Sequence, residues 1–385
     1  MRFLHTGDVH LSPAAPERFD AFRAVFGLAK ELDCAALLVA GDLFDSVEAA
    51  GELRPRVREL FNSHKIEVYI VPGNHDRTAY GAGEHYGINV HTAQSSSPVL
   101  WRAGEIGIVG LPYSFDRPSF EDLRAQTLLE KESPLIVLAH ANFFSSAFGR
   151  VYTPDAENAG ESCLWDHDFD EFPPAYVALG HWHNPTLPLV EINRVRVAYS
   201  GSPYPLARGE NGARKVFLIE ISSGEIKVEA VDIPGVPRRE TAAFYFVPGA
   251  EEETLEAIRS VLRDRADPNV ILDLEMGGWV SRISEELLVK KSEALIEEFR
   301  GGWKGVNPGT PCFLSTGRLS GIGSRCFQIL QESEIPPDII EAEVFRNTVL
   351  YGFAEKVIGD REALYREALA LILRHLGRGT LHADS

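Results

Sequence analysis

The sequence predicts a layered α/β protein with a large unit, a smaller α/β unit and a C-terminal helical segment. Apolar runs of strand length alternate with amphipathic helical stretches over residues 1–235, a pattern typical of layered α/β domains. After the Pro- and Gly-containing stretch IPGVPRRE, read as a linker, the alternation restarts over residues 236–330. Residues 331–385 are mostly helical in pattern. A chain of 385 residues is long enough for more than one core.

The large unit is expected to contain strands at its apolar runs, with two helices between the first of them. Amphipathic stretches at Glu17–Leu32 and in a segment ending at Leu60 predict these helices. The predicted strands are RFLHT, AALLVAG, IEVYIV, IGIVG, PLIVLAH and AYVALGH, followed by a strand-rich run from RVRVAYS to KVFLIEI.

The smaller unit repeats the alternation, and one bounded helix is predicted near the chain end. The smaller unit reads as strand AAFYFV, helix TLEAIRSVLRDR, strand NVILDLEM, helix SEELLVKKSEALIEEF and strand PCFLSTG. The later helix spans Arg361–Leu376, with Asp360 as its N-cap and Gly377 as its stop. Its apolar stripe includes Tyr365, Leu369, Ile372 and Leu376. We expect the stripe either to pack on the chain's own smaller domain or to dock a partner.

Composition limits the environment and the partners. The chain has no apolar run near the roughly 20 residues of a membrane helix, and MRFLHTGDVH lacks the features of a signal peptide, so a cytoplasmic protein is expected. The four cysteines form no CxxC pair, which favours packing roles over a disulfide framework or a zinc ribbon. The formal net charge is -18. Because proteins that grip nucleic acid usually carry basic patches, any phosphate binding here must be local.

Ligand-type side chains follow the ends of five predicted strands, in the order D-x-H, GDxxD, GNHD, H and GHxH. The residues are Asp8 and His10, then Asp42 and Asp45, then Asn74, His75 and Asp76, then His140, and finally His181 and His183. Functional groups gather past the carboxyl ends of strands in open α/β sheets, so the five sets are expected to converge. Each set alone reads equally well as a turn, a cap or a packed histidine, but the ordered series indicates one site.

The donor types predict two divalent metal ions. Carboxylate, imidazole and amide ligands suit Mn, Fe or Zn better than Ca, and the absence of cysteine disfavours a purely structural zinc site. Mn is the leading choice, with Fe, Zn or Mg as alternatives. Two ions roughly 3.5 to 4 Å apart can clamp the attacking and leaving oxygens of a phosphoryl displacement, so no protein nucleophile is needed. The sequence contains neither a GxxxxGK[ST] phosphate loop nor a GxSxG nucleophile elbow.

The motifs resemble those of the calcineurin-like metallophosphoesterases. More narrowly, the sequence is similar to the SbcD-type nucleases of DNA double-strand-break repair in MRFLHTGDVHL, LLVAGDLFD, VPGNHD, YVALGHWH and YSGSPYPLARGENGARKVFLIEI. The resemblance implies a sandwich of two sheets flanked by helices, with the smaller α/β domain as a cap. It also implies a Mn-dependent nuclease that acts on DNA ends.

The resemblance further implies a role for each site residue. One ion would be held by Asp8, His10, Asp42 and His183, and the other by Asp42, Asn74, His140 and His181, with Asp42 bridging. His75 would contact the phosphate and help the leaving oxygen depart. Asp76 is expected to orient its neighbours through hydrogen bonds. Asp45 stands where archaeal and eukaryotic relatives have histidine, as in the bacterial branch, and is expected to lie behind the ligands.

Three functions remain open from the sequence. The first is a nuclease for DNA ends, with residues 236–330 guiding the strand and a coiled-coil ABC-type ATPase of the SbcC type docked on the C-terminal helix. The second is a phosphodiesterase or phosphatase for a small phosphorylated metabolite, for which an acidic surface is no obstacle. The third is a binding protein that holds metal without turnover. A homodimer is a further assembly to test.

Overall fold

The computed structural model describes residues 1–315 except 82, 94–97, 115–133, 146–148, 151–161, 171–172, 193–194, 223–224, 247–248 and 281–282. Contacts divide the chain into two compact units, Met1–Arg239 and Glu240–Ser385. The predicted segment 331–385, with its helix Arg361–Leu376, lies outside the described residues, and the predicted boundaries after 235 and 330 stay predictions. The expected linker IPGVPRRE is shorter than predicted, because strand β16 (Arg238–Phe246) begins inside it.

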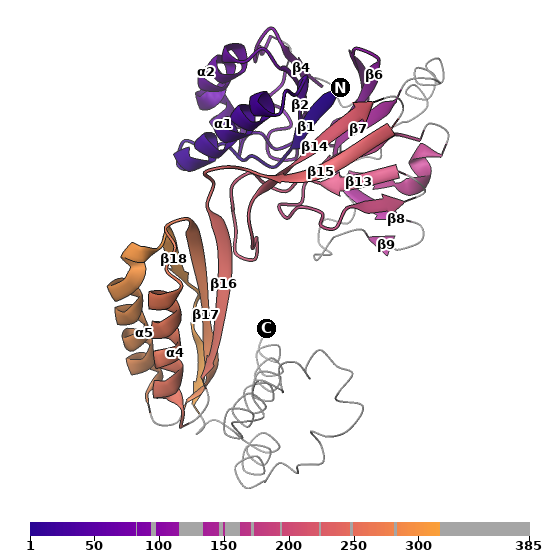
Figure 1. The fold of residues 1–385 in the computed structure, drawn as a ribbon. Helices are drawn as coiled ribbons and strands as arrows, with labels where there is room; N and C mark the ends of the chain where they lie inside the picture. The colour runs from indigo at the N-terminus through magenta and orange to yellow at the C-terminus, as the bar shows by residue number, and fades with distance from the viewer. Residues whose placement is uncertain are drawn as a thin grey trace, which may run out of the picture. The chain divides into compact units, whose positions relative to one another are not determined.

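The first unit contains two six-stranded sheets (Figure 1). The first sheet has the strand order β15-β14-β1-β2-β3-β4. The strands are β1 (Arg2–Thr6), β2 (Ala36–Ala40), β3 (Glu67–Val71), β4 (Val90–Thr92), β14 (Lys215–Ser222) and β15 (Glu225–Asp232). Strands β1 to β4 run parallel, so the carboxyl ends of β1, β2 and β3 share one edge.

The second sheet has the order β12-β13-β11-β7-β6-β5. Its strands are β5 (Val99–Ala103), β6 (Ile106–Leu111), β7 (Leu135–His140), β11 (Tyr176–Gly180), β12 (Val190–Ile192) and β13 (Val195–Tyr199). Strands β7 and β11 pair in parallel, so their carboxyl ends also lie together. A small sheet of β8 (Asn142–Ser145), β9 (Gly149–Arg150) and β10 (Cys163–Trp165) adjoins the 3₁₀ helix η1 (Asp166–Phe169).

Side-chain alternation sorts strand residues into layers. In β2, Leu37 and Val39 belong to the core that includes residues of helices α1 (Pro16–Glu31) and α2 (Val47–Ser63). Leu38 belongs to a separate core, shared with residues of the second sheet. Because a strand covered on both faces needs apolar residues at successive positions, these strands read as continuous apolar runs. The predicted sandwich of two sheets flanked by helices is confirmed.

The two helices begin beside the strand-end loops. Helix α2 starts directly after GDLFD, where the Ser46 hydroxyl accepts a hydrogen bond from the Ala49 backbone N–H at 3.2 Å. Helix α1 starts at Pro16, a residue well suited to the first helical position because it needs no hydrogen-bond partner for an N–H. These starts place Asp45 immediately before α2 and Arg18 in the first turn of α1.

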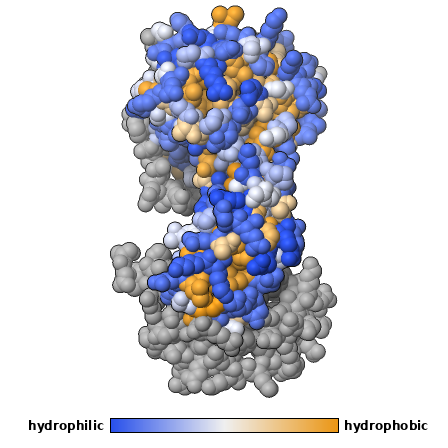
Figure 2. All heavy atoms as spheres, turned by 90° about the vertical axis from the view of Figure 1, so that its left-hand side faces the viewer, coloured by the Kyte–Doolittle hydropathy of each residue, from blue (hydrophilic) through white to orange (hydrophobic). Residues whose placement is uncertain are grey.

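The described part of the second unit, within residues 240–315, is a four-stranded sheet with two α-helices (Figure 1). Besides β16 it contains β17 (Val270–Val280), β18 (Gly305–Pro308), β19 (Cys312–Ser315), α4 (Glu251–Asp264), α5 (Glu285–Phe299) and the 3₁₀ helix η2 (Arg300–Gly302). Ile258 of α4 and Leu288 of α5 pack with Leu272 of β17 in one core. Polar residues cover most of the described surface on the face drawn in Figure 2, between apolar patches. No helix among the described residues has the length and apolar character needed to cross a bilayer.

Candidate metal centre

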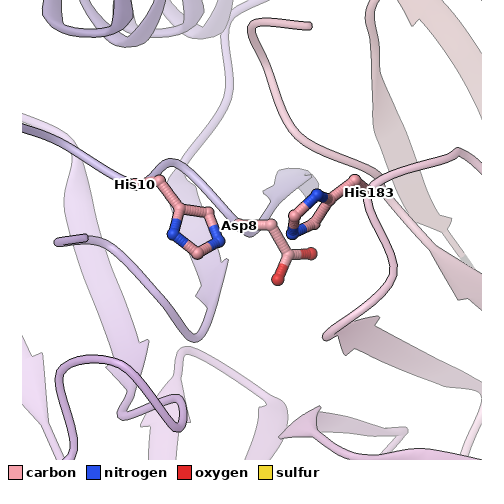
Figure 3. A group of neighbouring side chains, drawn as sticks. All are labelled: Asp8, His10 and His183. Atoms are coloured by element: carbon pink, nitrogen blue, oxygen red, sulfur yellow. The ribbon is translucent and has the colours of Figure 1, made fainter. Parts of the chain in front are cut away.

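The structure brings the ten predicted site residues together where strands of both sheets end. Asp8 and His10 follow β1, Asp42 and Asp45 follow β2, Asn74 to Asp76 follow β3, His140 ends β7, and His181 and His183 follow β11. Figure 3 shows His10 and His183 on either side of the Asp8 carboxylate. Three groups have ligand atoms within 4.8 Å of one another: Asp8–His10–His183, Asp8–Asp42–His140 and His10–Asp45–His75. The strand-end pattern therefore located one cluster.

The loops after β1 and β2 run side by side. The Asp8 N–H donates to the Gly41 carbonyl at 3.1 Å, and the His10 N–H donates to the Asp42 carbonyl at 2.9 Å. A Cβ atom on Gly41 would lie 2.2 Å from His140 Nδ1, and one on Gly180 would lie 1.7 Å from the Ala40 carbonyl oxygen. Both glycines are thus needed for the two sheets to bring their strand ends so close.

Backbone strain concentrates at the same residues. Among the described residues, six non-glycine positions have positive φ, and four of them are Asp8 (50°), His10 (50°), Asp42 (45°) and His181 (103°). Such conformations cost on the order of 1–3 kcal/mol each and cluster at functional sites. The rest of the fold therefore stabilises these unfavourable backbone conformations, which direct the four side chains into the cluster.

His140 has an unprotonated ring nitrogen that faces the other residues of the cluster. Its Nδ1 lies 3.0 Å from the Ala40 carbonyl oxygen, which can only accept, so Nδ1 carries the proton. Burial lowers the pKa of His140 to about 3, and the ring is therefore neutral near pH 7 with a bare Nε2. This Nε2 nevertheless lies 2.9 Å from Asn74 Oδ1 and 3.4 Å from Asp42 Oδ2. His181 Nδ1 also lies 3.3 Å from this Nε2. A nitrogen lone pair among carboxylate and amide oxygens and a second imidazole is a favourable place for a divalent cation.

His10, like His140, has a protonated Nδ1 and an unprotonated Nε2. Its Nδ1 donates to Asp45 Oδ1 at 3.2 Å, which leaves Nε2 unprotonated in the neutral ring. Burial, together with the neighbouring histidines, lowers the pKa of His10 to about 2. The buried Nε2 has no hydrogen-bond partner among the described residues and lies 3.7 Å from Asp42 Oδ2. A second imidazole lone pair is therefore directed at the same carboxylate.

The carboxylates of Asp8 and Asp42, at the centre of the cluster, also favour bound cations. Asp8 and Asp42 are both buried, and desolvation raises the pKa of Asp8 to about 7 and that of Asp42 to about 6. The like charge of Asp42 also raises the pKa of Asp8. The Asp8 carboxylate accepts the His181 backbone N–H, at 2.8 Å from Oδ1 and 3.1 Å from Oδ2. Buried carboxylates beside bare imidazole nitrogens fit divalent ions with mixed oxygen and nitrogen ligands.

His183 is held by a residue that the sequence analysis did not assign. Its Nδ1 donates to Glu210 Oε1 at 2.9 Å, so its Nε2 is left for the site. Burial would lower the pKa of His183, but this bond and the nearby negative charge raise it. Glu210 Oε2 in turn accepts the Leu206 N–H at 2.7 Å, and buried Arg214 donates to the carbonyl of Ser202 at 2.9 Å. Glu210 lies within the quoted stretch YSGSPYPLARGENGARK, but no periodic pattern distinguishes it there.

Glu210→Gln is expected to weaken metal binding about 10- to 100-fold at the ion nearest His183, because partners of this kind orient the ligand imidazole. Titration of the metal-free protein with Mn, followed by calorimetry, measures this affinity. Glu220→Gln is the matched control, since Glu220 pairs with Arg2 at the surface of β14. Equal Mn affinities in wild type and Glu210→Gln would show that His183 does not depend on Glu210.

His75 differs from the other histidines of the site. Its side chain is exposed, and Nδ1 donates to the Asp45 carbonyl at 3.1 Å. Its backbone N–H donates to Asp42 Oδ1 at 2.9 Å, which ties the GNHD loop to the central carboxylate. The ring packs edge-on against His10, with centroids 4.7 Å apart. His75 therefore presents Nε2 at the rim of the cluster.

Asp76 holds the GNHD loop in place through hydrogen bonds. Its buried carboxylate accepts hydrogen bonds from the Gly73 N–H at 2.9 Å, the Phe44 N–H at 3.1 Å and the Tyr80 hydroxyl at 2.7 Å. These donors come from the GNHD and GDLFD loops and from the turn after β3. Burial and the nearby Asp42 raise the pKa of Asp76 to about 6, while the three donors lower it. Asp76 thus joins the two loops that carry Asp42 and His75.

With this geometry in view, comparison with known proteins defines the class. Residues 1–185 match the family model described as calcineurin-like phosphoesterase. The first unit therefore carries a domain of this family, and the ligand groups at its strand ends support a metal-dependent phosphoester hydrolase as the class of protein. The family resemblance and the fold class predicted from the motifs are both confirmed.

Two SbcD subunits and one solved structure are among the proteins similar to this chain. The SbcD subunit of the nuclease SbcCD from Rhodobacter capsulatus is 29% identical over 287 residues, 58% of this chain and 67% of its own length. The corresponding SbcD subunit from Bacillus subtilis is 24% identical over 348 residues, 77% of this chain and 82% of its own length. Among solved structures, a dimetal phosphatase from Danio rerio aligns with 60% of this chain and 95% of its own, at 10% identity and a TM-score of 0.45.

Proposed function

We propose that this protein is a Mn-dependent nuclease that hydrolyses phosphodiester bonds at DNA ends. Its similarity to SbcD subunits of the nuclease SbcCD over more than half of the chain supports the substrate class. The observation that carries the proposal is the bare Nε2 of His140, which faces Asn74 Oδ1 and Asp42 Oδ2 at 2.9 and 3.4 Å. A divalent cation at this position would be coordinated by oxygen and nitrogen donors together, a mixture that suits Mn.

Each residue has a role in this proposal. Asp8, His10, Asp42 and His183 would hold one ion, and Asp42, Asn74, His140 and His181 would hold the other. When bound, two such ions stabilise the charge on the attacking and leaving oxygens of the phosphate. With both ring nitrogens protonated, His75 would donate the Nε2 proton to the leaving oxygen, while Nδ1 keeps its proton and stays bonded to the Asp45 carbonyl. Asp45 and Asp76 would keep His10 and the GNHD loop in place.

A substrate panel tests the proposal. Metal-stripped protein is assayed with linear duplex DNA, single-stranded DNA and bis-p-nitrophenyl phosphate, with and without added Mn. We expect Mn-dependent cleavage of at least one DNA substrate and of the small diester. Cleavage of the small diester without any cleavage of DNA would contradict the nuclease assignment, and full activity after exhaustive chelation would contradict the metal requirement.

A second candidate is a phosphodiesterase or phosphatase for a small phosphorylated metabolite. The formal net charge of -18 favours this candidate, because DNA carries one negative charge per phosphate and is repelled by an acidic surface. A small phosphate ester needs only local positive charge at the site. Cleavage of the small diester alone in the same panel would support this alternative.

The domain and partner assignments are also proposals. Residues 236–330 would guide the DNA strand toward the first unit, and the helix predicted at Arg361–Leu376 would dock an ATPase of the SbcC type. The apolar stripe of that helix supports the second assignment. Co-purification of the full chain, but not of a chain truncated after Val357, with such an ATPase tests it.

A further inference from the structure

We propose that Arg18 binds a non-bridging oxygen of the substrate phosphate, and that Asp45 holds the guanidinium in position to do so. The inference takes its substrate class, a phosphate ester, from the function proposed above. Arg18 belongs to no strand-end motif, and its placement follows only from the way the first turn of α1 packs beside the loops after β1 and β2.

One nitrogen of Arg18 makes both of its bonds to the site. Nη1 donates to the His10 carbonyl at 2.8 Å and to Asp45 Oδ1 at 3.2 Å. The other guanidinium nitrogens, Nη2 and Nε, have no hydrogen-bond partner among the described residues, and the side chain is 21% exposed. A guanidinium is a planar fork whose N–H pairs match the oxygens of a phosphate. Part of that fork is therefore available to a ligand.

Asp45 links Arg18 to His10, a proposed metal ligand, and to His75, the proposed proton donor. Its Oδ1 accepts from Arg18 and, at 3.2 Å, from His10 Nδ1, while its carbonyl accepts from His75 Nδ1 at 3.1 Å. Three positively charged or proton-donating groups are thus tied to one residue. Arg18 and His75 therefore share Asp45 as a hydrogen-bond partner.

The buried Arg214 provides a useful contrast. Arg214 is 1% exposed, and its guanidinium donates to the carbonyls of Ser202, Glu210 and His183, so it cannot reach a substrate. Arg18 has similar chemistry but stays partly in solvent. In a chain with net charge -18, a partly exposed arginine beside Asp45 offsets the repulsion that an arriving phosphate meets.

Arg18 could instead act only through Asp45, by neutralising its carboxylate and bracing His10. The two roles differ in a double-mutant cycle. If Arg18 acts only through Asp45, Arg18→Met has no further effect in a chain that already carries Asp45→Asn. If Arg18 touches the phosphate, its loss weakens phosphate binding in both backgrounds.

The test measures binding of inorganic phosphate to the full chain loaded with Mn, by equilibrium dialysis, and KM and kcat with bis-p-nitrophenyl phosphate. We expect Arg18→Met to weaken phosphate binding about 10- to 100-fold, the usual range for a lost hydrogen bond to a charged group. Its KM should rise more than its kcat falls, and Arg18→Lys should recover part of the binding. Arg23→Met is the control, because Arg23 lies on the same helix and pairs with Asp20 at the surface.

Four results would overturn the inference, and three of them concern Arg18→Met. These three are an unchanged phosphate affinity in Arg18→Met, a loss of bound Mn in that variant by elemental analysis, and no effect of Arg18→Met in the Asp45→Asn background. Absence of phosphate binding by the wild type would overturn it as well. Phosphate binding that depends on Arg18 without hydrolysis of any diester would instead support the inference and contradict the proposed function.

Discussion

Asp42→Ala is expected to abolish phosphodiester hydrolysis and to leave fewer than two bound ions per chain. Asp42 Oδ2 lies 3.4 Å from His140 Nε2 and 3.7 Å from His10 Nε2, so its carboxylate is shared by both halves of the cluster. Removal of a shared ligand affects both ions at once. Elemental analysis of the purified variant, together with Mn-dependent cleavage of bis-p-nitrophenyl phosphate, measures both losses.

Two further variants separate loss of function from loss of fold. Asp20→Ala removes an exposed carboxylate of α1 and should retain full activity. Asp42→Asn should be inactive yet, without metal at pH 7, no less stable to heat than the wild type. Burial raises the pKa of Asp42 to about 6, above the pKa of the same group in the unfolded chain. The metal-free wild type therefore loses stability as the pH rises from the unfolded-state pKa toward 6. Asp42→Asn does not ionise and avoids this loss. Retention of two ions and activity in Asp42→Ala would contradict the two-ion assignment.

His75→Ala should retain two ions and lose about 10²- to 10⁴-fold in turnover, the range expected when a general acid is removed. The structure places the exposed His75 ring at the rim, with Nδ1 bonded to the Asp45 carbonyl, rather than among the buried ligand atoms. Steady-state kinetics with the small diester gives the loss, and elemental analysis of the same preparation gives the metal content.

His64→Ala is a matched control for His75→Ala. His64 follows the last turn of α2, whereas Asp45 precedes its first turn, so the control lies at the opposite end of that helix from the site. It should have wild-type kinetics. A fall in bound metal in His75→Ala would make His75 a ligand and would remove it from the role of proton donor.

The central strands could be predicted from the sequence because both of their faces are buried. Leu37, Leu38 and Val39 face two different cores in succession, so each needs an apolar side chain and the strand reads as an unbroken apolar run. Short strands such as β4 and β12 were not predicted. They are three residues long and only partly buried, so no pattern sets them apart from loops.

The sequence by itself located the ten residues that cluster, because the carboxyl ends of parallel strands share an edge wherever such sheets form. The tertiary structure alone decided which nitrogen of His10, His140 and His183 faces the centre. That choice depends on acceptors far away in the chain: Ala40 for His140, Asp45 for His10 and Glu210 for His183. It also brought Arg18 to the rim, because a surface arginine in a first helical turn carries no local signal of what packs beside it. Local sequence specifies backbone and burial pattern, whereas a hydrogen bond between distant segments exists only once the chain has folded.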